Sequence, residues 1–536
     1  MAGKVANGIK EEDKSEIDLL TFHEQQAGRL IIDPAEAKIE LGEVVAAKLK
    51  LSEDGTKVLW PQPTDSPRDP QNWSTRRKNL QLIIITLASV VPDFESAIGT
   101  AGLFSLARQY DTSVGVINNL TTNWSIFLLG TVLAWTFNCL QQLTMISRVG
   151  RIACCHVDQT TGSPFNLILV STSRLGFPRG MCRCPQSQNL CCHAVCDCIL
   201  CGLYVVTDMY PFHLQARKLS IWTMGFIVSP FLSPFAFGFL VARTTWRWAY
   251  GIGCLYSLIV VLLIIFFMEE TMYDRTVKPI PEAPTGGLRN RIETLIGLTG
   301  ARMSKYRASW AESILTPLNV VWRPHLLMIL IFEAMLFGFG IGINVTNIIF
   351  LGSPPPLGYG FSQFAIAGSY GTPIVSAILG ELIGRYMNDW IMNVCVRRNN
   401  GVYEAESRLW ACYIAIPLYI CGFVLLGASF QNHLGTVALV FGWGIAELSI
   451  MINTVAVYAY CSDVFPKHQG EVSALINLAR ILGGFSVAYF QIPWSLKHGA
   501  IQVFGVEAAI VAGLFLLFVP FLQVKGRVLR GRYSMH

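Results

Sequence analysis

The hydrophobic positions of this chain gather in long blocks separated by short polar segments. Each block holds about twenty apolar residues, the length that an α-helix needs to cross the ~30 Å hydrocarbon layer of a membrane. Two further spans are expected between 150 and 212, since an even number keeps the basic loops on one side of the membrane. Ten blocks are clear, at 79–102, 117–140, 220–242, 246–268, 325–351, 363–388, 409–430, 434–459, 472–496 and 499–523.

Basic residues mark one side of these blocks. Arg76, Arg77 and Lys78 precede the first block, and the loop from 269 to 324 is rich in arginine. The loop through Pro354-Pro355-Pro356, on the opposite side, has no basic residue. Because basic loops stay on the cytosolic side, both termini are expected to be cytosolic. The net charge of +6 therefore indicates membrane orientation rather than an anionic partner.

Composition excludes several classes of protein. Of 536 residues, 52% are hydrophobic and 14% are charged, with a mean hydropathy of +0.45. Soluble proteins carry about 25% charged residues, so a soluble enzyme, a nucleic-acid-binding protein and a disordered scaffold are excluded. The sequence has no Gly-x-x-x-x-Gly-Lys-Ser/Thr phosphate loop and no His-Glu-x-x-His or Gly-x-Ser-x-Gly pattern. We expect a protein that is not an enzyme, holds no cofactor and does not hydrolyse ATP.

The central basic loop separates six expected spans from six others, which suggests two related halves. A short repeat supports duplication, because Asp208-Met-Tyr-Pro-Phe-His213 recurs as Asp463-Val-Phe-Pro-Lys-His468 where the fourth span of each half meets the fifth. We expect a cytosolic tail at 1–78, a six-helix bundle at 79–268, a cytosolic loop at 269–324, a second six-helix bundle at 325–523 and a cytosolic tail at 524–536.

Four motifs occur in a fixed order around the expected spans: Asp69-Pro-Gln-Asn-Trp-Ser74, Trp246-Arg-Trp-Ala-Tyr250, Glu269-Glu-Thr-Met-Tyr-Asp-Arg275 and Glu404-Ala-Glu-Ser-Arg-Leu409. With them, the chain resembles a twelve-span transporter of the major facilitator superfamily, in the fungal drug:proton antiporter-like group. The resemblance implies an all-α integral membrane fold with twelve transmembrane helices in two pseudo-symmetric six-helix bundles. It also implies a cavity near the middle of the membrane.

The fifth span of this group usually carries Gly-x-x-x-Gly-Pro-x-x-Gly-Gly. Here the segment reads Gly225-Phe-Ile-Val-Ser-Pro230-Phe-Leu-Ser-Pro234. Serine in place of glycine keeps the residues small, and small residues let membrane helices pack closely. Gly225 and Pro230 are therefore candidate gating residues, in a pattern looser than that of the group.

The group also has a charged latch, Gly-x-x-x-Asp-Arg-x-Gly-Arg-Arg, between the second and third spans. This chain has Arg148, Gly150 and Arg151 there but no acid, whereas a partial second copy runs from Gly384 to Asp389. The latch is therefore expected to depend on the C-terminal half. Candidate gating residues are Arg148, Gly150, Arg151, Asp208, Asp389 and Asp463.

The interval 152–201 departs from this pattern. Nine of the 15 cysteines lie between Cys154 and Cys201, and the apolar continuity of the third and fourth spans is lost. A metal-binding or redox domain is one interpretation, but the cysteines are not spaced as zinc ligands on a plausible scaffold. The favoured interpretation is a gene-prediction artefact or a frameshifted exon. No metal is expected.

Ionisable residues inside the spans cost about 2.5–3.5 kcal/mol each, so each is a functional hypothesis. Asp93 and Glu95 lie about 15 residues into the first span, and two residues apart they cannot share a helix face. Either is a candidate protonation site, with Glu95 alternatively at the outer interface. Glu381 and Glu507 lie near span ends and are expected to be interfacial.

Two further acids lie deeper in the second half. Glu333 and Arg480 lie at equal depth in the seventh and eleventh spans, so they could form an ion pair that is either structural or part of proton coupling. Glu447 has no basic partner evident in the sequence. It is either a proton carrier or a neutral acid hydrogen-bonded to Asn453 or a backbone carbonyl.

Aromatic residues in the spans either line a substrate cavity or fill gaps and face lipid. Asn119 lies near enough to the outer surface to be a candidate for N-glycosylation. The aromatic candidates are Trp124, Phe127, Trp135, Tyr370, Trp443, Tyr458 and Phe490.

The resemblance implies proton-coupled efflux of a drug-like compound or secondary metabolite across the plasma membrane. The expected partners are a small-molecule substrate, protons and the lipid bilayer, with no nucleic acid, and the protein is expected to be monomeric. One alternative is proton-coupled uptake of an organic nutrient. Another is a non-transporting relic or receptor, which the weakened latch and the interval 152–201 would support.

Overall fold

The fold is known from a computed structural model, which is described for residues 34–124, 127, 205–271, 318–398, 404–465 and 469–532, apart from positions 42, 48, 53, 60, 68, 270 and 356. Three gating candidates, Arg148, Gly150 and Arg151, lie outside the described residues. So do the cysteine-rich interval 152–201 and most of the central loop. The predictions made for these segments remain predictions.

By its contacts the chain divides into two units. The first comprises Met1–Asp65 with Pro211–His213, and the second comprises Ser66–Tyr210 with Leu214–His536. The described part of the first unit contains two short helices, α2 (Pro34–Leu41) and α3 (Glu43–Ala46). Lys50 pairs with Asp65 at 2.7 Å, and this ammonium group holds the pKa of the exposed Asp65 carboxyl below its usual value.

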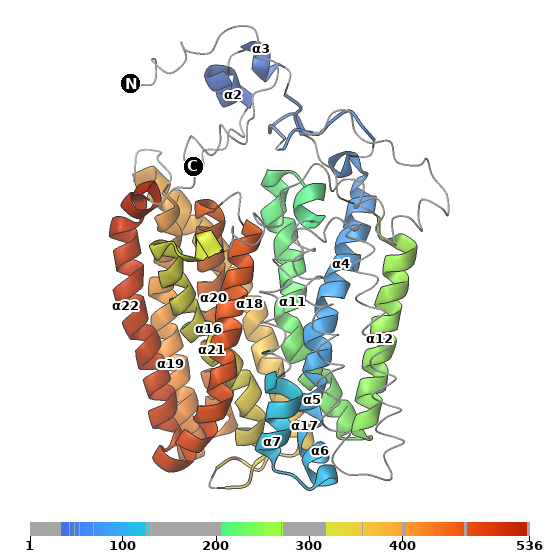
Figure 1. The fold of residues 1–536 in the computed structure, drawn as a ribbon, viewed down its shortest axis with the longest axis vertical. Coiled ribbons are helices and arrows are strands. Elements are labelled where there is room, and N and C mark those ends of the chain that lie inside the picture. Colours follow the sequence, from blue (N-terminus) through green and yellow to red (C-terminus); the bar gives the residue numbers. More distant parts are fainter. Residues whose placement is uncertain are drawn as a thin grey trace. The chain divides into compact units, whose positions relative to one another are not determined.

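Among the described residues, the membrane-length helices all belong to the second unit. Its N-terminal half contains η1 (Pro70–Asn72), α4 (Thr75–Ser96), α5 (Ile98–Ala101), α6 (Leu103–Tyr110), α7 (Val114–Asn118), the π-helical η2 (Asn119–Asn123), α11 (Phe212–Val241) and α12 (Trp246–Phe267). Its C-terminal half contains α16 (Pro324–Gly352), α17 (Gln363–Ser369), α18 (Gly371–Arg398), η4 (Ala405–Ala411), α19 (Cys412–Asn432), α20 (Thr436–Val464), α21 (Gln469–His498) and α22 (Ala500–Arg532). Figure 1 shows the long helices running along one common direction.

Each clear hydrophobic block coincides with helix wherever the structure describes it. Within the described residues, eight helices are long and apolar enough to cross a membrane. The first block corresponds to α4 and α5, which are separated at Ala97 rather than forming one continuous helix. The block at 363–388 is likewise divided at Tyr370, between α17 and α18.

The two halves use the same packing device. In the first half, a Cβ atom on Gly225 of α11 would lie 2.7 Å from Thr86 Cγ2 of α4. In the second half, a Cβ on Gly483 of α21 would overlap the carbonyl oxygen of Ala334 in α16. In both halves the first and fifth spans therefore approach closely through a glycine, as expected for helices that associate in a membrane.

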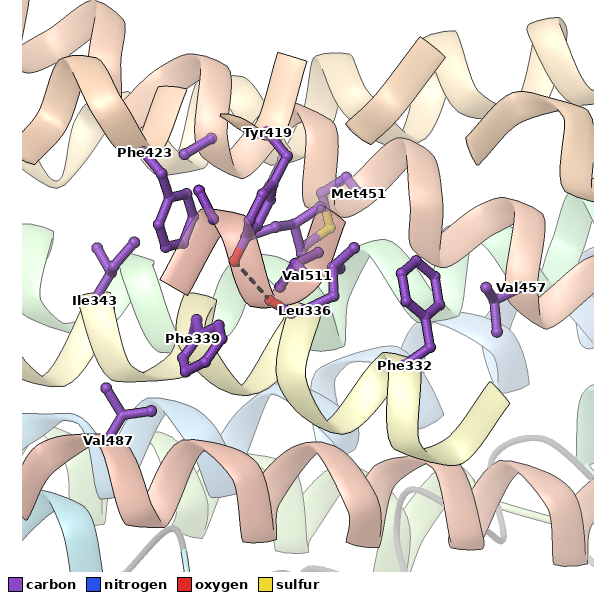
Figure 2. Close-up of a cluster of buried hydrophobic side chains, with 14 of the residues drawn as sticks. Phe332, Leu336, Phe339, Ile343, Tyr419, Phe423, Met451, Val457, Val487 and Val511 are labelled. Atoms are coloured by element: carbon purple, nitrogen blue, oxygen red, sulfur yellow. Dashed lines mark hydrogen bonds between the residues drawn. The ribbon is translucent and has the colours of Figure 1, made fainter. Parts of the chain in front are cut away.

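A large apolar core fills the C-terminal half. Figure 2 shows Phe332 and Leu336 of α16 with Tyr419 and Phe423 of α19, and all four side chains are buried. The Tyr419 hydroxyl donates a long hydrogen bond of 3.5 Å to the Leu336 carbonyl. Inside this half, the polar groups described below are surrounded by apolar side chains.

Large aromatic side chains are exposed at one end of the C-terminal half. Trp322 precedes α16, Tyr386 and Trp390 lie in the last part of α18, and Trp410 lies in η4. Because α16 starts where α18 ends and α19 begins, these residues lie toward the same end. Tryptophan and tyrosine are enriched at membrane–water interfaces, so this end marks one boundary of the hydrocarbon layer.

Candidate functional site

A buried ion pair joins α16 to α21. Arg480 Nη2 lies 2.6 Å and Arg480 Nε 2.8 Å from Glu333 Oε2. The Glu333 side chain is 0% exposed and that of Arg480 is 5% exposed. The sequence predicted that these two residues could pair because of their equal depth, and the structure brings them together.

Helix α20 completes the coordination of this pair. Asn453 Nδ2 donates to Glu333 Oε1 at 2.9 Å, and Arg480 Nη2 donates to Thr454 Oγ1 at 3.1 Å. Both Glu333 oxygens are thus hydrogen-bonded, which is the condition under which a buried carboxylate is tolerated. Three helices therefore meet at one polar centre, defined by Glu333, Arg480, Asn453 and Thr454.

Two aromatic rings contact the guanidinium group of Arg480. Its Cζ atom lies 4.1 Å from the ring centroid of Phe337 and 4.9 Å from that of Tyr458. The Tyr458 hydroxyl in turn donates to Asn477 Oδ1 at 2.9 Å. Cation–π contacts of this kind stabilise a desolvated guanidinium and restrict its orientation.

Glu447 does not join the polar centre. It is buried on α20, with 5% of its surface exposed, and no hydrogen bond links it to another described residue. Asn453 donates to Glu333 instead, so the alternative in which Asn453 bonds Glu447 was wrong. The proton-carrier hypothesis for Glu447 stays a prediction.

The two acids of the first span differ in their surroundings. Ser257 of α12 donates a short hydrogen bond to Glu95 Oε1. Asp93 Oδ2 is buried and has no hydrogen-bond partner in the described part of the chain. Because residues two apart point about 200° from each other around a helix, Asp93 faces away from the α4–α12 contact that contains Glu95.

A second buried polar network was missed by the sequence analysis. Gln491 Nε2 lies 3.1 and 3.0 Å from the two carboxyl oxygens of Glu507, and Thr346 Oγ1 donates to Gln491 Oε1 at 2.5 Å. Glu507 is 1% exposed and Glu381 is 8% exposed. The prediction that these acids are interfacial was therefore wrong for Glu507, which is held inside the C-terminal half by α16 and α21.

One arginine connects two of the gating candidates. Arg408 of η4 donates to Asp463 Oδ2 at 3.1 Å and to Asp389 Oδ1 at 3.4 Å. It also donates to Asn388 Oδ1 at 3.1 Å. Arg408 was not named as a candidate, although it lies within the motif that precedes the ninth span. The signal that could have identified Arg408 is its position at the start of the ninth span. Asp389 and Asp463 lie at the same end of their own spans.

The small-residue motif of α11 has a local explanation. Pro230 has no backbone N–H with which to bond the carbonyl of Phe226, and the Ser229 hydroxyl donates to that carbonyl at 2.7 Å instead. Gly225 packs on α4 as described above. In the same half, Asp208 is half-buried just before α11, and Asn119 is half-buried in the first position of η2.

Most aromatic candidates belong to packed clusters. Tyr370 and Trp443 are fully buried against each other, with ring centroids 5.2 Å apart. Trp124 and Phe127 pack on Phe485 of the other half, at 5.3 and 4.3 Å. Trp135 lies outside the described residues.

Hydrogen bonds join the two halves of the second unit. Asn118 Nδ2 donates to the Val345 carbonyl at 3.1 Å, and Asn123 Nδ2 donates to the Phe485 carbonyl at 3.3 Å. Gln363 Nε2 also donates to the Ala101 carbonyl, at 2.8 Å. Of the elements involved, α5, α7 and α17 lie at the same end of the long helices in Figure 1.

Eight apolar helices of membrane length, among the described residues, indicate an integral, multi-pass membrane protein. Residues 198–488 match the family described as the Major Facilitator Superfamily, which is more than half of the chain. The chain therefore belongs to this superfamily. Its members are transporters of small molecules across membranes rather than enzymes, which confirms the class predicted from the sequence.

The chain is similar to fungal transporters along most of its length. An uncharacterized MFS-type transporter of Schizosaccharomyces pombe is 25% identical over 479 residues, covering 78% of each chain. The efflux pump radE of Floropilus chiversii is 21% identical over 448 residues, covering 82% of this chain and 78% of that protein.

Solved structures also show the fold. The xylose transporter XylE from E. coli, in a partially occluded inward-open conformation, matches with a TM-score of 0.57 and 13% identity. The match covers 83% of this chain and 98% of that one. The predicted all-α membrane fold of this superfamily is therefore confirmed.

Proposed function

We propose that this protein exports a small organic compound from the cytosol in exchange for protons. It works as a monomer in the plasma membrane, with both termini in the cytosol. The bundles at 79–268 and 325–523 rock against each other, and the segment 269–324 connects them on the cytosolic side.

The observation that carries this proposal is the buried polar centre of the C-terminal half. Glu333 and Arg480 are charged groups in an apolar interior, and each would cost about 2.5–3.5 kcal/mol on insertion scales. Asn453 donates a further hydrogen bond to Glu333, and Thr454 accepts one from Arg480, but the pair is still surrounded by apolar side chains. An arrangement this costly is typical of a transport pathway, where substrates and protons meet fixed charges.

The contacts between the halves support alternating access. Gln363 joins the halves at one end, the end that the loop charges predict to be extracellular, whereas Asn123 joins them near the middle of α21. The ion pairs of Arg408 with Asp389 and Asp463, called the Arg408 latch below, lie at the opposite end. They connect only elements of the C-terminal half. Opening the first set of bonds while the other end closes would expose the polar centre to the other side.

The direction of transport rests on similarity and on sequence. A relative that covers most of the chain is named an efflux pump. The fifth span also retains Gly225 and Pro230 of the antiporter-type motif.

A transport assay tests the proposal. Cells that express the protein and matched cells that lack it are loaded with a panel of fluorescent lipophilic dyes, with and without a proton uncoupler. We expect at least one dye to accumulate less in expressing cells and to rise to the control level on uncoupling. An uncoupler-sensitive gain would indicate uptake instead, and equal accumulation of every dye in both cell types would contradict transport of this class.

A further inference from the structure

One nitrogen of the buried arginine is left without a protein partner. Arg480 Nε and Nη2 are bonded to Glu333 and Thr454, whereas Nη1 has no hydrogen-bond partner in the described part of the chain. The Arg480 side chain is only 5% exposed. A guanidinium group has five N–H donors in a fixed plane, so an unused Nη1 leaves two donors aimed away from Glu333.

The surroundings of Nη1 restrict what can bind there. Phe337 and Tyr458 contact the guanidinium group, so a ligand is expected to approach in its plane, beside aromatic rings. Both side chains are only half-buried, so part of each ring is left as apolar surface for a flat molecule. Tyr458 is itself held by Asn477, and the ring is therefore fixed in position before a ligand arrives.

The charge of the polar centre determines the charge of the ligand. Glu333 already neutralises Arg480, so an anion bound at Nη1 would bring an uncompensated negative charge into an apolar interior, which is costly. A neutral carbonyl oxygen can accept from Nη1 without that penalty. Hydrogen bonds from charged donors are stronger than those between neutral groups, which makes a carbonyl group an effective partner.

We propose that Arg480 Nη1 binds the carbonyl oxygen of a neutral, planar substrate, such as an aromatic lactone or ketone. Glu333 and Thr454 are positioning residues, since they fix the guanidinium group while leaving Nη1 free. This inference rests on the proposed transport function, because the ligand is taken to be the exported compound. The binding step itself needs no gradient and no movement of the halves.

The test is a set of binding titrations with the purified full-length protein in detergent, with protein-free micelles as the blank. Three probes are compared: coumarin, a neutral planar lactone; 2H-chromene, which has a similar shape but no carbonyl group; and 2-naphthoate, a planar anion. We expect coumarin to bind at least about tenfold more tightly than 2H-chromene, the size expected for one hydrogen bond to a charged group. We expect 2-naphthoate to bind no better than 2H-chromene.

Variants assign the effect to Arg480. The double variant Glu333→Gln with Arg480→Gln removes both charges together and keeps the pair neutral, so it is the version expected to fold. It should lose the preference for coumarin over 2H-chromene. Thr454→Val should reduce that preference several-fold, and Arg243→Gln, which changes an exposed arginine placed over the Phe364 ring, should leave it unchanged.

Two results would overturn the proposal: a double variant that still prefers coumarin, or a wild-type protein that binds 2-naphthoate more tightly than coumarin. A wild-type protein with no preference between coumarin and 2H-chromene would do the same. Because the titration measures binding alone, a failure of proton-coupled export in cells would not alter its result. If cells export a dye but the purified protein does not prefer coumarin to 2H-chromene, the proposed function is supported and the proposed binding site is refuted.

Discussion

Glu333 accepts hydrogen bonds from three donors, two on Arg480 and one on Asn453. Breaking a buried ion pair costs more than removing it, because the remaining charge is left without compensation. A variant that removes one partner should therefore be less stable than a variant that removes both. This asymmetry can be measured without knowing the substrate.

Arg480→Gln is expected to lower the free energy of unfolding by about 3–5 kcal/mol, since it leaves the Glu333 carboxylate unpaired. The double variant Glu333→Gln with Arg480→Gln should recover most of that loss. Thermal unfolding of the purified variants in one detergent measures both effects. Arg243→Gln, at an exposed arginine, is the control, and an Arg480→Gln protein as stable as this control would show that the pair is not desolvated.

The acids of the first span lead to a second prediction. Asp93→Asn is expected to reduce uncoupler-sensitive dye export about tenfold or more, because the half-buried Asp93 has a buried carboxyl oxygen, Oδ2, with no hydrogen-bond partner among the described residues. Glu95→Gln should retain more than about half of that export, because a glutamine can still accept from Ser257.

Export is measured at equal protein levels, determined by fluorescence of a fused reporter. Both variants retaining full uncoupler-sensitive export would exclude the first span as the proton site. Glu447→Gln would then be the remaining test, since Glu447 is buried on α20 without a hydrogen bond to the described residues. If that variant also kept full coupling, none of these three acids would carry the proton.

Sequence reasoning found some residues of the polar centre and missed others for physical reasons. Glu333 and Arg480 could be paired because depth along a membrane helix can be counted from the span ends. The donor Asn453 was one alternative partner for Glu447, since the rotation of α20 about its axis is fixed only by packing against neighbouring helices, chiefly α18 and α19. Glu507 was placed at the interface by its distance from the span end, and only the structure shows its bond to Gln491.

The helices themselves were predictable from the sequence, because a span of apolar residues has few alternatives to an α-helix in lipid. Their interruptions were not. The break at Ala97 between α4 and α5 and the π-helical turn of η2 lie within hydrophobic blocks. Hydrophobicity does not show which carbonyl a backbone N–H group bonds to. A helix break or a π-helical turn is therefore determined by packing against neighbouring helices, which the sequence pattern does not reveal.

The crossing of α16 and α21 leads to a prediction at this scale. Gly483→Ala is expected to destabilise the protein by about 1–3 kcal/mol, since the added methyl group would overlap the Ala334 carbonyl and force the helices apart. Gly505→Ala, on α22, is the matched control, because a Cβ there meets nothing within 4 Å. Thermal unfolding in detergent compares the two, and equal stabilities would contradict the close approach of α16 and α21.

The latch between η4, α18 and α20 should affect transport more than stability. Arg408→Gln leaves Asp389 and Asp463 without their shared cation, and we expect dye export to fall several-fold. The unfolding free energy should change by less than about 1 kcal/mol, because the partner carboxylates are partly exposed to solvent. Arg397→Gln, at an exposed position near the end of α18, is the control, and export equal to this control would show that the latch has no role in gating.

At the scale of the whole molecule, the two halves must separate at one end for a substrate to pass. In this structure that end is joined by side-chain amides that donate to backbone carbonyls, including the bond from Gln363 to Ala101. Such bonds can form and break without separating charges, so they suit a contact that opens in every cycle. Replacing one of them with a covalent bond should therefore stop the cycle and leave the fold intact.

The variant Ala101→Cys with Gln363→Cys tests this consequence. On oxidation we expect a disulfide between the halves, with dye export lost by about tenfold or more, and on reduction we expect export to return. The single variants under the same oxidant are the controls, since they retain the chain's native cysteines. Full export by the oxidised double variant, with the cross-link shown by mass spectrometry, would mean that the halves do not part between α5 and α17 during transport.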